Sequence, residues 1–177
     1  MNTSSRILLL PLAALVASAP ARATVYLSIE DAQKQMFGAA AMTAQPLSLD
    51  PAQMKAIEKA SGVPVRGSLV RTWRAADGGW FFVDAVIGKS ELITYAVGLD
   101  AGGRIKQVEV LEYRESHGGE IRYPGWRKQF VDKKAGDELR LGEDIQGISG
   151  ATLSCEHVTD GIRRLMATWA LVLKPVG

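Results

Sequence analysis

The C-terminal part of the chain carries its apolar side chains at helical spacing. They recur every three or four positions, at Val158, Ile162, Leu165, Met166, Trp169 and Leu173. This spacing draws one apolar stripe along a helix and leaves most charged and hydroxyl side chains on other faces. The pattern predicts a long C-terminal amphipathic helix that buries its stripe, including Met166 and Trp169, against a sheet.

The middle of the chain instead has the pattern of β-strands. Four segments rich in β-branched and aromatic residues are separated by short turns that contain glycine. The segments are 69–75, 79–87, 92–99 and 104–113. Because such turns are too short for crossover connections, we expect the strands to be antiparallel neighbours. Apolar and polar residues mix on both faces of the fourth segment, so the pattern leaves its buried face open.

Two short helices are predicted before these strands. The first begins after Ser28, which forms an approximate capping box with Asp31. The second has Asp50 as its N-cap and Pro51 at its first position, and it ends before Gly62. Together, the helices and strands predict an α+β fold: an antiparallel sheet of about four or more strands packed against helices.

The N-terminal segment has the pattern of a secretory signal peptide. Arg6 precedes an apolar run at 7–17, and small residues end in A-R-A at 21–23. These are the three regions of such a leader, and the run is shorter than the roughly 20 apolar residues that span a bilayer. We therefore expect cleavage after residue 23, which leaves one periplasmic or otherwise exported domain at 24–177 with no membrane span.

Loss of the leader would balance the charge of the protein. It removes two of the 21 Lys and Arg residues and none of the 19 Asp and Glu residues. No broad cationic field remains that would favour nucleic acid or an anionic membrane surface. Cys155 is the only cysteine, so an internal disulfide is excluded, and no Cys/His spacing typical of a metal or haem site is present. The sequence thus indicates neither catalytic residues nor metal ligands.

The most informative motif is Ser149-Gly150-Ala151-Thr152, just before the amphipathic helix. Free backbone N–H groups and the positive end of the helix dipole favour a phosphate at this place. The small residues Gly150 and Ala151 leave the backbone accessible. The alternative is a tight loop with an ordinary N-cap, which needs only one such residue. The motif therefore favours a phosphate-bearing ligand close to Thr152.

Residues 148–154 resemble the flavinylation motif of FMN-binding domains. Such domains occur in subunits of the Rnf complex and the sodium-translocating NADH:quinone reductase, and in stand-alone exported flavoproteins. The resemblance extends over 99–173 and is strongest over 141–163. It implies FMN as the cofactor, attached through a phosphoester to Thr152 by a separate flavin transferase that uses FAD. The neighbouring residues implied to bind FMN are Ser149, Gly150, Ala151 and Leu153.

The chain departs from the family pattern at one position of this motif. The family usually has an aspartate six residues before the threonine, where this chain has Gln146. Asp144 lies two residues further upstream. Non-covalent binding of FMN does not depend on that aspartate.

A second segment, 113–120, resembles the family loop that lies against the flavin ring. The glutamate and following glycine of the family match Glu115 and either Gly118 or Gly119. The glycines would let the backbone approach a planar ring, and groups of Glu115 and Ser116 would hydrogen-bond its polar edge. The residues alone leave open an ordinary polar loop after a strand.

Other side chains near these segments have a structural interpretation. We expect Trp126 and Phe130 to be buried rather than stacked on the flavin. Cys155 is more typical of core packing than of a reactive thiol. We expect Arg163 and Arg164 to form a solvated helix face.

The resemblance implies an exported electron-transfer flavoprotein, in which the flavin carries the chemistry and the protein sets its binding and potential. Its implied partners are the flavin transferase and membrane-associated redox proteins or cytochromes, and it would turn over no substrate of its own. The alternative is a non-covalent FMN-binding redox-sensing or accessory module. A hydrolase with Ser149 or Thr152 as nucleophile is disfavoured, because only His117 and His157 are available as base and no G-x-S-x-G elbow is present.

Overall fold

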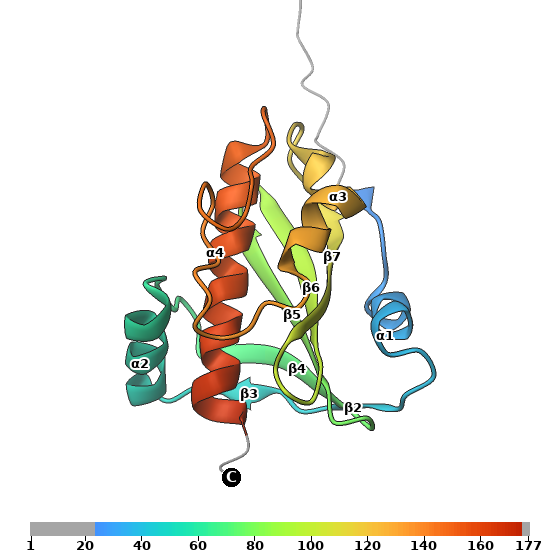
Figure 1. The fold of residues 1–177 in the computed structure, drawn as a ribbon, viewed down its shortest axis with the longest axis vertical. Coiled ribbons are helices and arrows are strands. Elements are labelled where there is room, and N and C mark those ends of the chain that lie inside the picture. The colour runs from blue at the N-terminus through green and yellow to red at the C-terminus, as the bar shows by residue number, and fades with distance from the viewer. Residues whose placement is uncertain (1–23, 175–177) are drawn as a thin grey trace, which may run out of the picture.

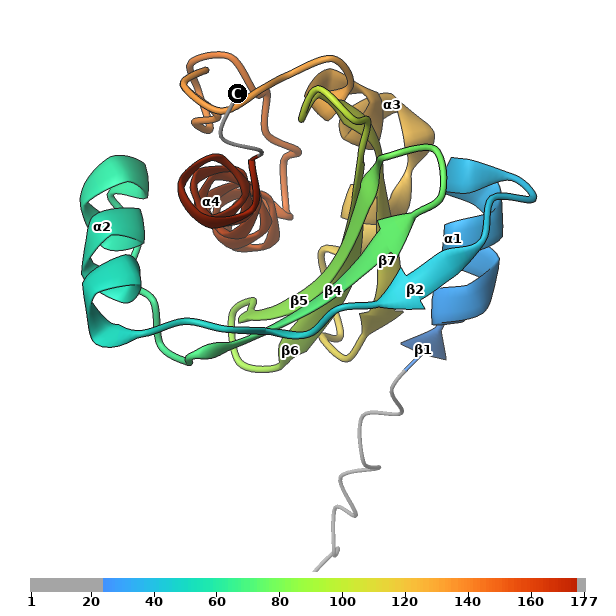
Figure 2. The ribbon, with the colours of Figure 1, turned by 90° about the horizontal axis from the view of Figure 1, so that it is seen from below.

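A computed structural model describes residues 24–174 of the chain. The predicted signal peptide at 1–23 lies outside the described residues. The described part forms one curved antiparallel sheet with helices on both of its faces, as Figures 1 and 2 show. The prediction of an α+β fold with an antiparallel sheet is therefore confirmed.

The four predicted strands are present as consecutive antiparallel neighbours. They are β4 (Leu69–Ala75), β5 (Trp80–Ile87), β6 (Leu92–Leu99) and β7 (Ile105–Tyr113). Short strands extend the sheet at its two sides: β1 (Thr24–Val25) pairs with β7, while β2 (Met42–Ala44) and β3 (Leu47–Ser48) pair with β4. These three short strands have only two or three residues each, too few for a periodic pattern in the sequence.

The helices begin where their caps predict. α1 (Ile29–Phe37) follows Ser28, whose hydroxyl accepts a hydrogen bond from the backbone N–H of Asp31. α2 (Pro51–Ser61) has a complete capping box and ends at Gly62 in the left-handed conformation. The long C-terminal helix is α4 (Thr152–Thr168), continued by a π-helical turn, η3 (Trp169–Leu173). Three short helical segments lie between β7 and α4: η1 (Gly119–Arg122), α3 (Pro124–Arg127) and η2 (Lys128–Phe130).

The core lies on both faces of the sheet. On one face α4 buries its predicted stripe, with Met166 1% and Trp169 5% exposed. The connection from β7 to α4 packs on the same side and buries Trp126 and Phe130, as predicted. On the other face α1 covers a smaller cluster that includes Phe81. Figure 2 shows α4 and α1 on opposite sides of the sheet.

Two bulges in β7 settle the question of its buried face. The pairing with β6 skips Lys106 and again skips Leu111. Each extra residue resets the alternation of side chains between the two faces. Ile105 and Tyr113 therefore join Val108 in the α4-side core, and Leu111 packs with α1 on the other side.

Candidate functional site

The first turn of α4 has the geometry that an anion requires. Thr152 is the first helical residue, and the N-cap, Ala151, supplies no side-chain hydrogen bond. The backbone N–H groups of Thr152, Leu153 and Ser154 have no acceptor among residues 24–174. Such free donors at the positive end of a 17-residue helix favour a phosphate. The described residues therefore fit the phosphate end of FMN.

The motif is accessible from outside. Ser149, Gly150, Thr152 and Leu153 are exposed, whereas Ala151 is buried. Gly150 has a φ of 84°, and a methyl group at its Cα would meet no atom within 4 Å. Thr152 is thus accessible from solvent, and no atom lies close to the Cα of the neighbouring Gly150 on its side-chain side.

The second predicted segment lies directly beside the motif. The hydroxyl of Tyr113, at the end of β7, is 2.9 Å from the hydroxyl of Ser154 in the first turn of α4. Tyr113 donates its own proton to the backbone carbonyl of His117, so Ser154 donates in the contact between the two hydroxyls. Burial raises the pKa of the Tyr113 hydroxyl above its ordinary value, which keeps this donor protonated.

Gly118 has an internal role in this contact. Its φ is 86°, and a Cβ there would lie 2.7 Å from the Tyr113 hydroxyl and 3.0 Å from the Ser154 hydroxyl. Glycine is therefore required for the loop to close on the first turn of α4. A Cβ at Gly119 would meet only ordinary contacts, at 3.8 Å and beyond. The contact of either glycine with a flavin ring stays a prediction.

Glu115 is engaged with the turn between β5 and β6. Its carboxylate accepts hydrogen bonds from the backbone N–H groups of Ser90 and Glu91. Burial raises the pKa of this carboxyl, but the backbone donors of Glu91, Ser90 and Lys89 outweigh that effect and hold its pKa below the ordinary value. The next residue, Ser116, is exposed and contacts the ring of His117 at 2.9 Å.

His157 of α4 holds the same turn from the other side. Its Nδ1 lies 2.6 Å from the carbonyl oxygen of Ile87 and 2.9 Å from that of Gly88. Since both neighbours are acceptors, Nδ1 carries the hydrogen. The sequence interpretation included Tyr113 and Ser154 in the two segments but missed the contact between them, and it missed the role of His157. The only available signal was the position of Ser154 two residues after the motif threonine.

Asp144 builds the loop before the motif. Its carboxylate accepts hydrogen bonds from the backbone N–H groups of Leu139 and Arg140, at 3.1 and 2.8 Å, and from the Lys133 ammonium at 2.7 Å. Burial raises the pKa of Asp144, but Lys133 and the backbone donors outweigh burial and lower it. Both carboxylate oxygens of Asp144 therefore already accept hydrogen bonds within the loop. The side chain of Gln146, in contrast, is exposed.

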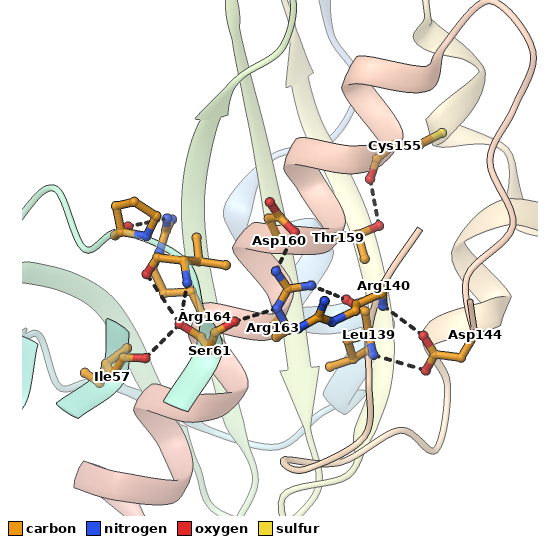
Figure 3. A network of polar contacts seen from close by, with 12 residues as sticks. Ile57, Ser61, Leu139, Arg140, Asp144, Cys155, Thr159, Asp160, Arg163 and Arg164 are labelled. Atoms are coloured by element: carbon orange, nitrogen blue, oxygen red, sulfur yellow. Dashed lines mark hydrogen bonds and ion pairs between the residues drawn. The ribbon is translucent and has the colours of Figure 1, made fainter. Parts of the chain in front are cut away.

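The expectation of a solvated Arg163–Arg164 face is wrong. Arg163 donates to the carbonyl oxygens of Ser61 and Leu139, at 2.7 and 2.8 Å, and pairs with Asp160 (Figure 3). Only 16% of its side chain is exposed. Arg164 forms an ion pair with Asp84 at 2.7 Å and is also largely buried. Arg163 thus connects α4 to the end of α2 and to the loop at Leu139, and Arg164 connects α4 to β5. Guanidinium groups form strong hydrogen bonds with such carbonyl and carboxylate oxygens.

Cys155 behaves as a packing residue, as expected. It is fully buried in the α4-side core, and burial raises the pKa of its thiol.

Within residues 24–174, no helix has both the length and the apolar composition to cross a bilayer.

Comparison with known families agrees with this geometry. A family model described as the FMN-binding domain matches residues 88–167. The match begins at the β5–β6 turn, earlier than the resemblance predicted, and contains both the 113–120 segment and the Thr152 motif. No curated protein sequence is significantly similar to the chain. Residues 88–167 therefore belong to the FMN-binding domain family, and FMN is the cofactor of this domain.

Proposed function

We propose that the protein is an exported electron-transfer flavoprotein whose FMN is attached through a phosphoester to Thr152. The observation that carries this proposal is the exposed hydroxyl of Thr152 at a helix start with three backbone N–H donors that have no acceptor among residues 24–174. FMN supplies one- and two-electron redox chemistry when bound. The protein holds the group and controls its surroundings.

The attachment step requires only Thr152 and FAD on the transferase. Thr152 Oγ forms a bond to the phosphorus of the FMN half of FAD, and the phosphoanhydride bond to AMP breaks. The hydroxyl proton leaves, and AMP is the leaving group. No electron is gained or lost in this step, so a separate oxidant is not needed.

The backbone of the first turn of α4 then holds the phosphate oxygens. The N–H groups of residues 152–154 donate to them, and the helix dipole adds a favourable field at this end. Gly150 and Ala151 keep side-chain bulk away from the phosphate. These groups would hold the phosphate at the exposed first turn of α4.

Glu115 has a positioning role in this proposal. Its carboxylate already accepts hydrogen bonds from two backbone N–H groups of the β5–β6 turn. It therefore fixes the position of the 113–120 loop relative to that turn. Ser116 and the backbone of Gly119 remain exposed enough to contact the flavin ring. The expected ring contacts therefore belong to Ser116 and Gly119 more than to the Glu115 carboxylate or to Gly118, which is buried.

A second candidate is a non-covalent FMN-binding redox-sensing or accessory module, and Gln146 favours it. The family aspartate is absent at this position, and Asp144 is unable to replace it because its oxygens are used within the loop. The two candidates differ in the bond to Thr152 and share the FMN cofactor. Membrane-associated redox proteins or cytochromes are the proposed electron partners of the first candidate.

Co-expression with a flavin transferase tests the attachment. Flavin fluorescence in a denaturing gel is expected for the natural chain and for Ser149→Ala, which removes the other exposed hydroxyl of the motif. Thr152→Ala is expected to lose the fluorescent band. A band that persists in Thr152→Ala contradicts the assignment, and FMN that copurifies with the native protein but leaves on denaturation favours the second candidate.

A further inference from the structure

One half of β5 forms an open edge of the sheet. β5 pairs with β6 along its whole length, from Trp80 to Ile87, but its pairing with β4 ends at Val83. Beyond this point β4 no longer pairs with β5, and its residues Leu69 and Val70 pair only with β3 on the opposite edge of β4. No described strand therefore pairs with residues 84–87 on their outer side. Open strand edges present backbone donors and acceptors that pair with other chains.

The hydrogen bonds around this edge show which groups face outward. The N–H of Gly88 donates to the carbonyl of Glu91 across the turn, so the next pair, Ile87 and Leu92, points its backbone groups away from each other. The same alternation turns the backbone groups of Ala85 outward. The Ala85 N–H donates to the Asp84 carboxylate at 2.8 Å, and the Ile87 carbonyl accepts a hydrogen bond from His157 Nδ1. The Ala85 carbonyl and the Ile87 N–H remain directed to the open side.

A cleft of about 910 Å³ lies along this edge. One wall is the continuous backbone of residues 83–89, the opposite wall is segment 63–71, and α4 contributes side chains from His157 to Thr168. None of residues 149–153 lines the cleft. The cleft is therefore separate from the Thr152 motif, and its long walls suit an extended segment.

The border of the cleft has an excess of positive charge. Arg66 and Arg71 lie in segment 63–71 and Lys89 in segment 83–89; all three are exposed and form no ion pair within residues 24–174. The acidic side chains of the cleft are already paired: Asp84 binds Arg164 and the Tyr95 hydroxyl, and Asp160 binds Arg163. An occupant of the cleft would meet cationic groups without a matching set of free carboxylates.

Exposed apolar side chains lie beside the same edge. Leu69 is 68% exposed, Ile87 52% and Leu92 42%. Large apolar side chains grouped around an open edge are typical of an interaction surface. These side chains would give an occupant of the cleft apolar contacts, in addition to backbone hydrogen bonds and attraction to the cationic groups.

We propose that this cleft binds an extended, acidic segment of a partner protein, which adds as a strand to β5 at residues 84–87. Backbone pairing with Ala85 and Ile87 would supply the main contact, as in other cases of strand addition. Acidic side chains of the segment would approach Arg66, Arg71 and Lys89, and its β-branched side chains would cover Ile87 and Leu92. The inference does not depend on the attachment of FMN at Thr152.

A blocked octapeptide of valine, threonine and glutamate is the probe, with fluorescence anisotropy as the readout. The exported chain is used both with and without FMN, and binding is expected in both forms. Ile87→Pro removes the N–H that remains free on the open side and leaves the β5–β6 pairing intact, so it is expected to weaken binding about tenfold. Arg66→Gln and Arg71→Gln are each expected to weaken it about two- to fivefold, and Lys55→Gln, on α2 outside the cleft, to leave it unchanged.

Two matched peptides and one protein measurement complete the test. A peptide with lysine in place of glutamate, and one with N-methylated backbone, are expected to bind at least about tenfold more weakly. Hydrogen exchange of the Ile87 amide is expected to slow when the first peptide binds. Thermal unfolding of each variant shows that it is folded.

Four outcomes overturn the proposal. They are no saturable peptide binding, equal binding by folded Ile87→Pro, preference for the lysine peptide, and loss of binding when FMN is loaded. Sedimentation that shows a dimer abolished by Ile87→Pro would assign the edge to a second copy of this chain instead, which also contradicts the proposal.

Discussion

The Tyr113 hydroxyl lies 2.9 Å from the Ser154 hydroxyl, and this contact joins the end of β7 to the first turn of α4. Forty-one positions separate the two residues in the chain. The contact brings the 113–120 segment against the Thr152 motif, the two segments identified separately from the sequence. The proposed flavin site therefore depends on a hydrogen bond that neither segment forms alone.

Tyr113→Phe tests this dependence. Loss of the hydroxyl removes the contacts with Ser154 and the His117 carbonyl, so the free energy of unfolding is expected to fall by about 1–2 kcal/mol. The flavin fluorescence and midpoint potential of the loaded protein are expected to shift, because the loop beside the motif loosens. Urea unfolding and redox titration measure the two effects. Tyr123→Phe, at an exposed tyrosine, serves as the control, and equal behaviour of both variants would contradict the role of Tyr113.

Three glycine substitutions separate backbone strain from crowding. Gly118→Ala combines a positive φ with a clash against Tyr113 and Ser154, so we expect it to lower the free energy of unfolding by about 3 kcal/mol. Gly150→Ala has a positive φ in open space and is expected to cost about 1 kcal/mol. Gly125→Ala has neither and is expected to be neutral or slightly stabilising. Urea unfolding checks the order, and a Gly118→Ala protein as stable as Gly125→Ala would show that the loop does not close as described.

The lowered pKa of Asp144 predicts that the free energy of unfolding depends on pH. Its pKa in the folded protein is below the ordinary value of 3.8, which it regains on unfolding. Its contribution to stability is therefore fully present above the unfolded-state pKa and is lost as pH falls through the lower, folded-state pKa. Asp144→Asn is expected to be less stable at neutral pH by about 1–3 kcal/mol and to lose less stability on acidification. Chemical unfolding at pH 7 and across the acid range measures both. Parallel pH profiles of the two proteins would contradict this assignment.

The fold was largely predictable because its main elements carry strong local signals. The capping box at Asp50 and the stripe through Ile162 mark helices without any tertiary information. The buried face of β7 was not predictable, because the bulges at Lys106 and Leu111 arise from pairing with β6 and have no local signature. β1 to β3 are too short to show a period.

The site was predictable only where its residues form a contiguous motif. Thr152 could be placed at a helix start from the residues around it. The roles of Glu115, His157 and Arg163 depend on partners 24 to 102 positions away in the chain, so no local pattern reveals them. Arg163 in particular has the helical position of a solvated residue, but the C-terminal end of α2 and the 139–148 loop cover it.

Gln146→Asp restores the residue that the family has before its threonine. The backbone of Gln146 is held by Trp126 and Gln129, while its side chain is exposed, so the substitution is expected to leave the fold unchanged. We expect faster and more complete attachment of FMN by a flavin transferase, measured as a time course of gel fluorescence. Gln129→Asp would not serve as a control, because Gln129 binds the Gln146 backbone; Gln45→Asp, at an exposed position between β2 and β3, is more suitable. Equal time courses for Gln146→Asp and the natural chain would show that this position does not limit attachment.

The most direct test of the central claim is the intact mass of the protein after export from a host that contains a flavin transferase, followed by mapping of the flavin-bearing peptide. The expected mass is higher by one FMN less one water, with the flavin on the peptide that contains Thr152. A mass equal to the unmodified chain, or a flavin on another peptide, would contradict it.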